Sequence, residues 1–205
     1  MKNILLTSLM FLFTTSVWAQ RFSSTLTMHD GSVKEGVVSL PKNNAKTVTF
    51  ALNDGKTIRI PSADIAVMSV TNRSGAVGEL EYVPVATPRS SLSGARDKIQ
   101  GYMWLFVETR GYVTLYSTHS SSYWVGRELP EFRHFCRREG EKLAALVATS
   151  SPSPTSFGHN KNFRRYASVY FADDQVIVDQ INDGTFTNKN LVQMVEEYNN
   201  RRSKD

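Results

Sequence analysis

The stretch that most constrains the fold is Lys46–Val70, which predicts three strands in succession. Apolar and polar side chains alternate in TVTFAL, as they do on a strand with one buried face. Asp54 and Gly55 follow, and this pair supplies the positive φ angle of a tight hairpin turn. Pro61 ends the return strand because proline has no N–H for the ladder. Residues 65–70 complete a small antiparallel unit.

The preceding stretch, Thr25–Leu40, has a similar pattern, with Asp30 and Gly31 at the turn. Two such hairpins in a row resemble a small SH3-like or Sm-like barrel. The resemblance rests on hairpin order, covers about a quarter of the chain, and brings no functional residue with it. The export signal described next disfavours RNA binding by analogy with Sm proteins.

The first residues predict export. Lys2 gives a positive start, Ile4–Phe13 is an apolar segment, and Ala19 ends a cleavage pattern. The apolar segment is far shorter than the roughly 20 residues that a bilayer requires. We therefore expect a signal peptide over 1–19 and a periplasmic or extracellular location. Cys136 is the sole cysteine and lies far from the cut, so we expect neither a lipid anchor nor an internal disulfide.

Composition divides the remaining chain. We expect a small β-domain over 20–85, a Ser- and Pro-containing linker or long loop over 86–98, and β hairpins with C-terminal helices over 99–200. Residues 201–205 are predicted to be a disordered, dispensable tail.

The second β block is rich in aromatic and β-branched residues. MWLFV and YVTLY flank a turn at 108–111 and predict a hairpin. STHSSS at 117–122 reads as a loop, and Tyr123–Val125 as a short strand. Residues 132–137 and 142–147 predict another hairpin, although Ala and Leu leave a helix open for the second arm.

Helical periodicity begins after residue 156. Asp173 or Asp174 is placed to cap a short helix that Gly184 ends. Thr187 is the expected N-cap of the last helix. Its apolar stripe comprises Leu191, Met194, Val195 and Tyr198. Hairpins followed by helices predict an α+β fold in which the helices cover the second β block.

The order of these elements resembles that of a known group of proteins. Hairpins, then Tyr170-Phe171, then Phe186 and a helix ending in Tyr198-Asn199 resemble uncharacterised secreted proteins of Bacteroidetes. The likeness implies an envelope or extracellular location and no catalytic residue.

One pair of residues offers catalytic chemistry. His134 and Cys136 would share a strand face, and neighbouring arginines would lower the pKa of a thiol. A thiol-dependent enzyme is therefore one hypothesis. The alternative is a buried cysteine beside a structural histidine, and we favour it because free cysteine is commonly buried.

A second group of residues suggests a binding surface. Trp104 and Phe106 share one face of an expected strand whose other face is also apolar. Either the helices cover the Trp104 face, which we expect, or it joins Tyr123 and Trp124 in a binding surface.

Other functional classes lack their motifs. The four histidines have no metal-ligand spacing, and no phosphate-binding glycine loop or serine nucleophile elbow occurs, so no metal or cofactor is expected. Without Lys2 the chain keeps 23 basic and 19 acidic residues, a net charge of +4. The arginine pair Arg137–Arg138 is surrounded by acidic residues, which disfavours nucleic acid. These are Glu128, Glu131, Glu139 and Glu141. The sequence thus favours a non-enzymatic binding or scaffold module whose partner is another envelope protein or an anionic envelope surface.

Overall fold

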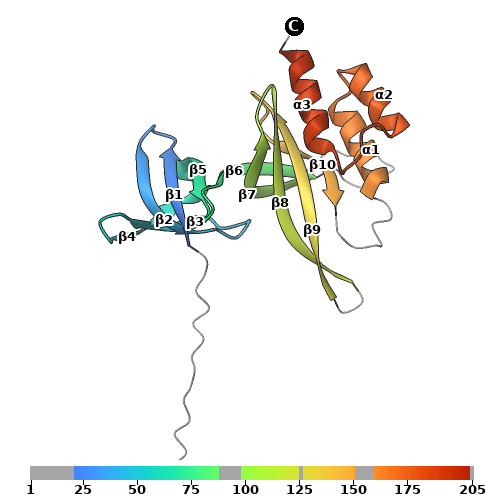
Figure 1. Cartoon of the computed structure of the whole chain (residues 1–205). Helices are drawn as coiled ribbons and strands as arrows, with labels where there is room; N and C mark the ends of the chain where they lie inside the picture. The colour runs from blue at the N-terminus through green and yellow to red at the C-terminus, as the bar shows by residue number, and fades with distance from the viewer. Residues whose placement is uncertain (1–20, 88–97, 125–126, 151–158, 204–205) are drawn as a thin grey trace, which may run out of the picture.

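The computed structural model describes residues 21–87, 98–124, 127–150 and 159–203 (Figure 1). The predicted signal peptide and residues 88–97 of the predicted linker lie outside these ranges. The described chain is α+β, with a mostly antiparallel sheet followed by helices, which confirms the predicted fold class.

The N-terminal sheet contains the two predicted hairpins and is ordered β5-β1-β2-β3-β4. Its elements are β1 (Arg21–Met28), β2 (Val33–Ser39), β3 (Thr47–Leu52), β4 (Thr57–Pro61), the 3-10 helix η1 (Ser62–Asp64) and β5 (Ile65–Thr71). The last strand returns beside the first, as the barrel resemblance requires. Among the described residues β4 pairs only with β3, so the sheet is strongly bent but not closed.

A single strand, β6 (Val77–Thr87), belongs to both halves of the molecule. Its residues 77–80 pair with β5, and residues 80–87 pair with β7 (Lys98–Thr109). The expected boundary between residues 85 and 86 therefore falls inside a strand, and Ala86 and Thr87 are not part of a linker. The two halves share backbone hydrogen bonds and cannot be separated at this point without breaking them.

The second sheet continues through β8 (Val113–Trp124), β9 (Arg127–Arg138) and β10 (Ala144–Ser150). β10 returns to β6 and pairs with it in parallel, so β6–β10 form a closed ring. Every strand of the ring supplies buried apolar side chains to its interior, namely Val83, Val85, Leu105, Tyr116, Phe135, Ala144 and Leu146.

Two local predictions in this sheet are wrong. Residues 117–122, expected to be a loop, belong to β8, because each of them pairs with β9 from Ser117↔His134 to Ser122↔Leu129. The helical alternative for residues 142–147 is also wrong, since β10 pairs with strands on both sides.

Three helices lie on the side of the second sheet away from the N-terminal sheet (Figure 1). They are α1 (His159–Tyr170), α2 (Gln175–Asp183) and α3 (Leu191–Arg202). Asp174 caps α2 by accepting the backbone N–H of Val176 at 3.1 Å, and Gly184 ends it with φ of 88°, as predicted. The prediction that Thr187 is the N-cap of α3 is wrong, because α3 starts after Asn190. Thr187 instead belongs to the preceding turn, where its backbone N–H donates to Asn190 Oδ1.

The predicted stripe of α3 is buried as a unit. Leu191, Met194, Val195 and Tyr198 are at most 3% exposed and pack with Cys136 and other residues of the sheet. Burying each such side chain stabilises the fold by roughly 1.5–3 kcal/mol.

The end of α3 is fixed to β8 by a side chain. The Asn199 amide accepts the N–H of Val113 at 2.8 Å and donates to its carbonyl at 2.9 Å, as a neighbouring strand would. A Cβ atom at Gly111 would collide with this amide, so any larger residue there would have to displace the amide from its hydrogen bonds to Val113.

The predicted disordered tail is wrong for its first residues. Arg201 and Arg202 continue α3, and both reach back to the turn between α1 and α2. The Arg201 guanidinium lies 2.7 Å from Asp174 Oδ2, and that of Arg202 lies 2.7 Å from Asp173 Oδ2. The sequence shows two arginines near the C-terminus, but it does not show that they form ion pairs with Asp173 and Asp174.

This arrangement predicts the effect of truncation. Ending the chain after Asn200 should lower the free energy of unfolding by about 1–3 kcal/mol, because Asp174 is largely buried and would lose a charged partner. Ending it after Arg202 is the control and should change the value by less than about 0.5 kcal/mol. Urea unfolding measures both, and equal stability of the two truncated chains would contradict a stabilising role for the Arg201–Asp174 and Arg202–Asp173 ion pairs.

Candidate functional site

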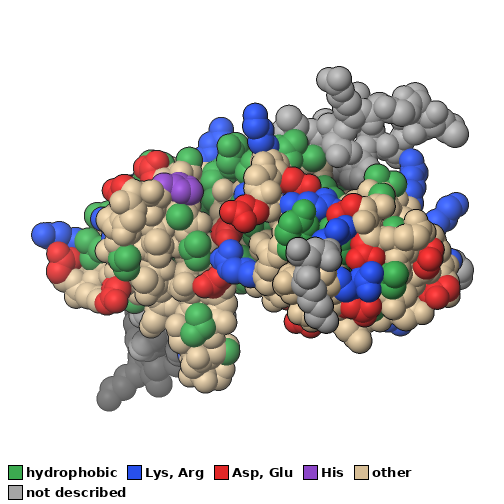
Figure 2. All heavy atoms as spheres, turned by 90° about the horizontal axis from the view of Figure 1, so that it is seen from above, with side chains coloured by type: hydrophobic (Ala, Val, Ile, Leu, Met, Phe, Trp, Pro, Cys, Tyr) green, Lys and Arg blue, Asp and Glu red, His purple; other side chains and the backbone are tan. Residues whose placement is uncertain are grey.

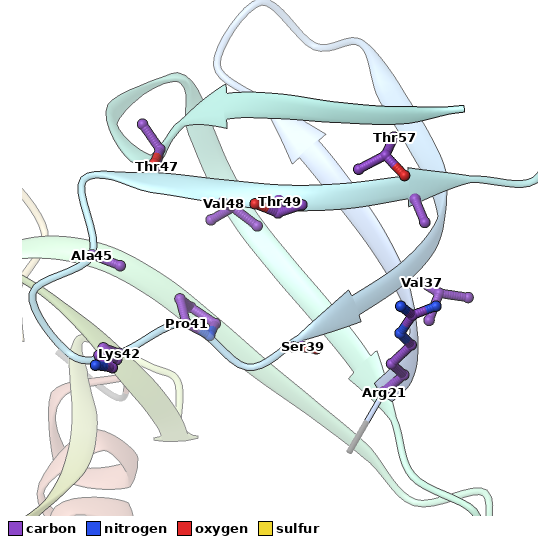
Figure 3. Close-up of a pocket in the computed structure, with 11 residues that line it drawn as sticks. Arg21, Val37, Ser39, Pro41, Lys42, Ala45, Thr47, Val48, Thr49 and Thr57 are labelled. Atoms are coloured by element: carbon purple, nitrogen blue, oxygen red, sulfur yellow. The ribbon is translucent and has the colours of Figure 1, made fainter. Parts of the chain in front are cut away.

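A pocket of about 300 Å³ lies on the outer face of the N-terminal sheet (Figure 3). β1 to β4 and the β2–β3 loop all contribute to its lining. The lining residues are Arg21, Val37, Ser39, Pro41, Lys42, Ala45, Thr47, Val48, Thr49, Ala51 and Thr57.

The strand pattern explains why polar side chains gather here. Val48 and Phe50 of β3 point into the core, so their neighbours Thr47 and Thr49 point outward into the pocket. Gly36 of β2 is buried against β3, and a Cβ there would collide with the carbonyl of Ala51. Glycine therefore lets β2 and β3 approach closely beneath the pocket.

The pocket is electrostatically one-sided. Arg21 and Lys42 are exposed basic residues in its lining, and none of the described residues that line it is acidic. No ion pair involving either cation is present in the described part of the chain. Ser39 and the threonines add hydroxyl groups, which can donate and accept hydrogen bonds. The pocket thus offers two uncompensated positive charges and a polar rim.

The loop that forms one wall of the pocket is fastened to the second sheet. The backbone N–H of Trp104 donates to the carbonyl of Asn43 at 2.7 Å, and the Asn43 amide donates to the carbonyl of His119 at 2.7 Å. The Trp104 indole N–H donates to Ser62 Oγ at 3.1 Å, and Ser62 Oγ donates to the carbonyl of Ala45 at 2.7 Å. Because Ala45 lines the pocket, this chain of bonds positions the wall.

The structure corrects the predicted aromatic surface. Trp104 is only 2% exposed, and the core of the N-terminal sheet covers it, whereas we expected the helices to do so. Phe106 on the same face is 38% exposed. Tyr123 and Trp124 end β8, and their side chains lie outside the described residues. The prediction is therefore wrong for Trp104, whereas for Phe106, Tyr123 and Trp124 it stays a prediction.

The geometry gives the Cys136–His134 pair no catalytic features. Cys136 has no exposed surface, and burial raises the pKa of its thiol far above neutrality. Burial likewise lowers the pKa of His134, whose Nε2 lies 3.5 Å from Ser150 Oγ. No hydrogen bond joins the two side chains among the described residues.

A buried charged cluster in the ring is fully paired. Glu81 accepts hydrogen bonds from Arg110 at 2.6 Å, from Tyr116 at 2.8 Å and from Arg137 at 3.0 Å. Because the carboxylate already has these partners, we assign the cluster to stability. Its residues are far apart in the sequence, so no spacing could reveal it.

Three other features of the described residues bear on function: groups of metal ligands, helices long enough to span a membrane, and surface charge. In the described ranges no group of three or more His, Cys, Asp or Glu side chains is arranged to hold a metal ion. Likewise, none of the described helices combines the length and apolar character needed to span a membrane. On the face seen in Figure 2, basic and acidic side chains are interspersed, unlike the one-sign surface typical of nucleic-acid binding.

Comparisons with protein-family models, with curated proteins and with solved structures gave no match.

The wall contacts predict the effect of one substitution. Ser62→Ala leaves the Trp104 indole N–H and the Ala45 carbonyl without their buried partner, and should lower the free energy of unfolding by about 1–3 kcal/mol. Ser203→Ala is the matched control on the surface, with an expected change below about 0.5 kcal/mol. Equal unfolding free energies for the two variants would show that Ser62 does not hold the loop.

The thiol can be tested directly. Cys136 should resist a maleimide probe at neutral pH and react fully in denaturant, because it is buried and its pKa is raised. Mass spectrometry of the intact chain measures the labelling. Rapid labelling of the native protein would restore the thiol-enzyme hypothesis.

Proposed function

We propose that this chain is an exported, non-enzymatic binding module whose ligand site is the pocket of the N-terminal sheet. The observation that carries this proposal is the pocket itself. It is concave, has two cations without acidic partners in the described chain, and has a wall fixed from behind by Trp104. A fixed wall favours binding because little conformational freedom is lost when a ligand enters.

The N-terminal pattern of residues 1–19 supports export, and the resemblance to secreted Bacteroidetes proteins agrees with it. An anionic envelope surface is a better partner for the pocket than another envelope protein. The pocket volume is near the lower end of the range of small-molecule sites, whereas a protein partner would need a broad contact surface. The charge of the pocket is also of the matching sign.

The thiol-enzyme alternative has no comparable support. A nucleophile must reach its substrate, and Cys136 lies in the core between the sheet and the helices.

A pocket-filling variant tests the proposal. Thr49 is exposed and lines the pocket, so Thr49→Trp fills the space while keeping a residue type that suits a strand. Thr27→Trp is the matched control, since Thr27 is an exposed strand residue outside the pocket lining. Residues 20–205 of each variant are sedimented with insoluble cell-wall material from the organism that carries the gene.

The wild-type chain and Thr27→Trp should sediment with the wall material, and Thr49→Trp should bind at least tenfold more weakly. Equal binding by the two tryptophan variants would contradict the pocket as the site. Cell fractionation tests export separately: the full-length chain, uncleaved, in the cytoplasm would contradict that part of the proposal.

A further inference from the structure

We infer that the pocket binds an acidic sugar unit, with the anionic group at Arg21 and the hydroxyl groups of the ring against the Ser and Thr rim. This inference rests on the proposed function and specifies its ligand. It depends on three properties of the lining: its charge, its hydroxyl groups and its lack of aromatic rings.

The two cations lie at opposite ends of one side of the pocket, so a single small anionic group would contact one of them, and Arg21 is the better suited. The Arg21 guanidinium is planar and can hold both oxygens of a carboxylate or phosphate at once, whereas the Lys42 ammonium acts as a compact charge. In Figure 3 the two side chains lie along the β2 and loop side of the pocket, with Pro41 between them. Neither cation meets an acidic partner in the described chain, so an anion would not have to displace one.

The opposite side of the pocket provides hydrogen-bonding groups. Thr47 and Thr49 from β3 and Thr57 from β4 lie across from the cations in Figure 3. Hydroxyl groups that both donate and accept are suited to the hydroxyl groups of a sugar. The lining also includes Val37 and Ala51, whose small apolar surfaces suit the C–H groups of a ring.

The lining also predicts that neutral sugars should bind weakly. It has no Trp, Tyr or Phe on which a neutral sugar ring could stack. The charge of the ligand must therefore supply much of the affinity. Because Arg21 and Lys42 are exposed, salt should screen their attraction strongly, over a Debye length of about 8–10 Å at physiological ionic strength.

Calorimetric titration of residues 20–205 at low salt tests the inference with four probes: D-glucuronate, glucose 6-phosphate, D-glucose and inorganic phosphate. At least one of the two acidic sugars should bind tenfold or more tightly than both glucose and phosphate. The tighter of the two tells whether the pocket prefers a carboxylate or a phosphate ester. Raising the salt to 0.5 M should weaken this binding at least fivefold.

Variants assign the effect to the pocket. Arg21→Gln should weaken binding of the acidic sugar about five- to tenfold, and Lys42→Gln, which removes a more distant charge, should weaken it less than Arg21→Gln does. Arg59→Gln is the control, because Arg59 is an exposed cation of β4 that does not line the pocket, and it should leave the affinity unchanged.

The contradicting results separate the inference from the proposed function. If glucose binds as tightly as the acidic sugars, the cations do not contribute to the affinity. If inorganic phosphate binds as tightly as the acidic sugars, the pocket is an anion site that does not recognise the sugar ring. Either result overturns the inference and leaves the pocket as a binding site. If none of the four probes binds, the inference is also overturned. The proposed function fails as well only if Thr49→Trp sediments with wall material as the wild type does.

Discussion

The burial of Trp104 is the interaction on which the two halves of this molecule depend. The side chain belongs to β7 of the second sheet, yet it lies in the core of the N-terminal sheet, beside Phe50 and Met68 among others. Its indole N–H has a partner there in Ser62, as a buried tryptophan requires. β6 joins the same two halves by backbone pairing on either side. The unit of structure is therefore larger than either sheet.

The same contact explains why the pocket wall is held in place. A loop of seven residues between β2 and β3 would by itself be among the least stable parts of a small domain. Here its backbone is bonded to Trp104 through Asn43, and through Ser62 at Ala45. The second sheet and its helices thus act as a support for a site that lies on the N-terminal sheet. The second sheet is itself closed into a ring by the pairing of β10 with β6. The buried stripe of α3 packs against this sheet.

Local patterns in the sequence were sufficient for most of the elements. Asp-Gly turns and period-two alternation located the N-terminal hairpins, and Asp174 and Gly184 marked the ends of α2, because each of these signals acts over a few residues. The start of α3 was misplaced because Thr187 and Asn190 both have capping side chains and the sequence does not rank them. Residues 117–122 were misread because a serine-rich strand in the middle of a sheet has the composition of a loop.

The site was harder to predict than the fold. Trp104 and Phe106 were correctly placed on one strand face, but nothing local shows which distant element covers that face. The pocket lining comes from four strands and a loop, and its residues are individually ordinary. The one signal available was the alternation that turns Thr47 and Thr49 away from the core. Gly36 and the Glu81 cluster depend on contacts across the sheets and have no sequence signature.

The most direct measurement of where a ligand binds is a ¹H–¹⁵N NMR titration of residues 20–205 with D-glucuronate. Backbone amide signals of β2, β3 and the loop between them should shift, together with the indole N–H signal of Trp104 behind the wall. Signals of α1, α2 and α3 should stay in place, since the helices lie on the far side of the second sheet. Shifts confined to the helices or to the paired ends of β8 and β9 would contradict a ligand site on the N-terminal sheet.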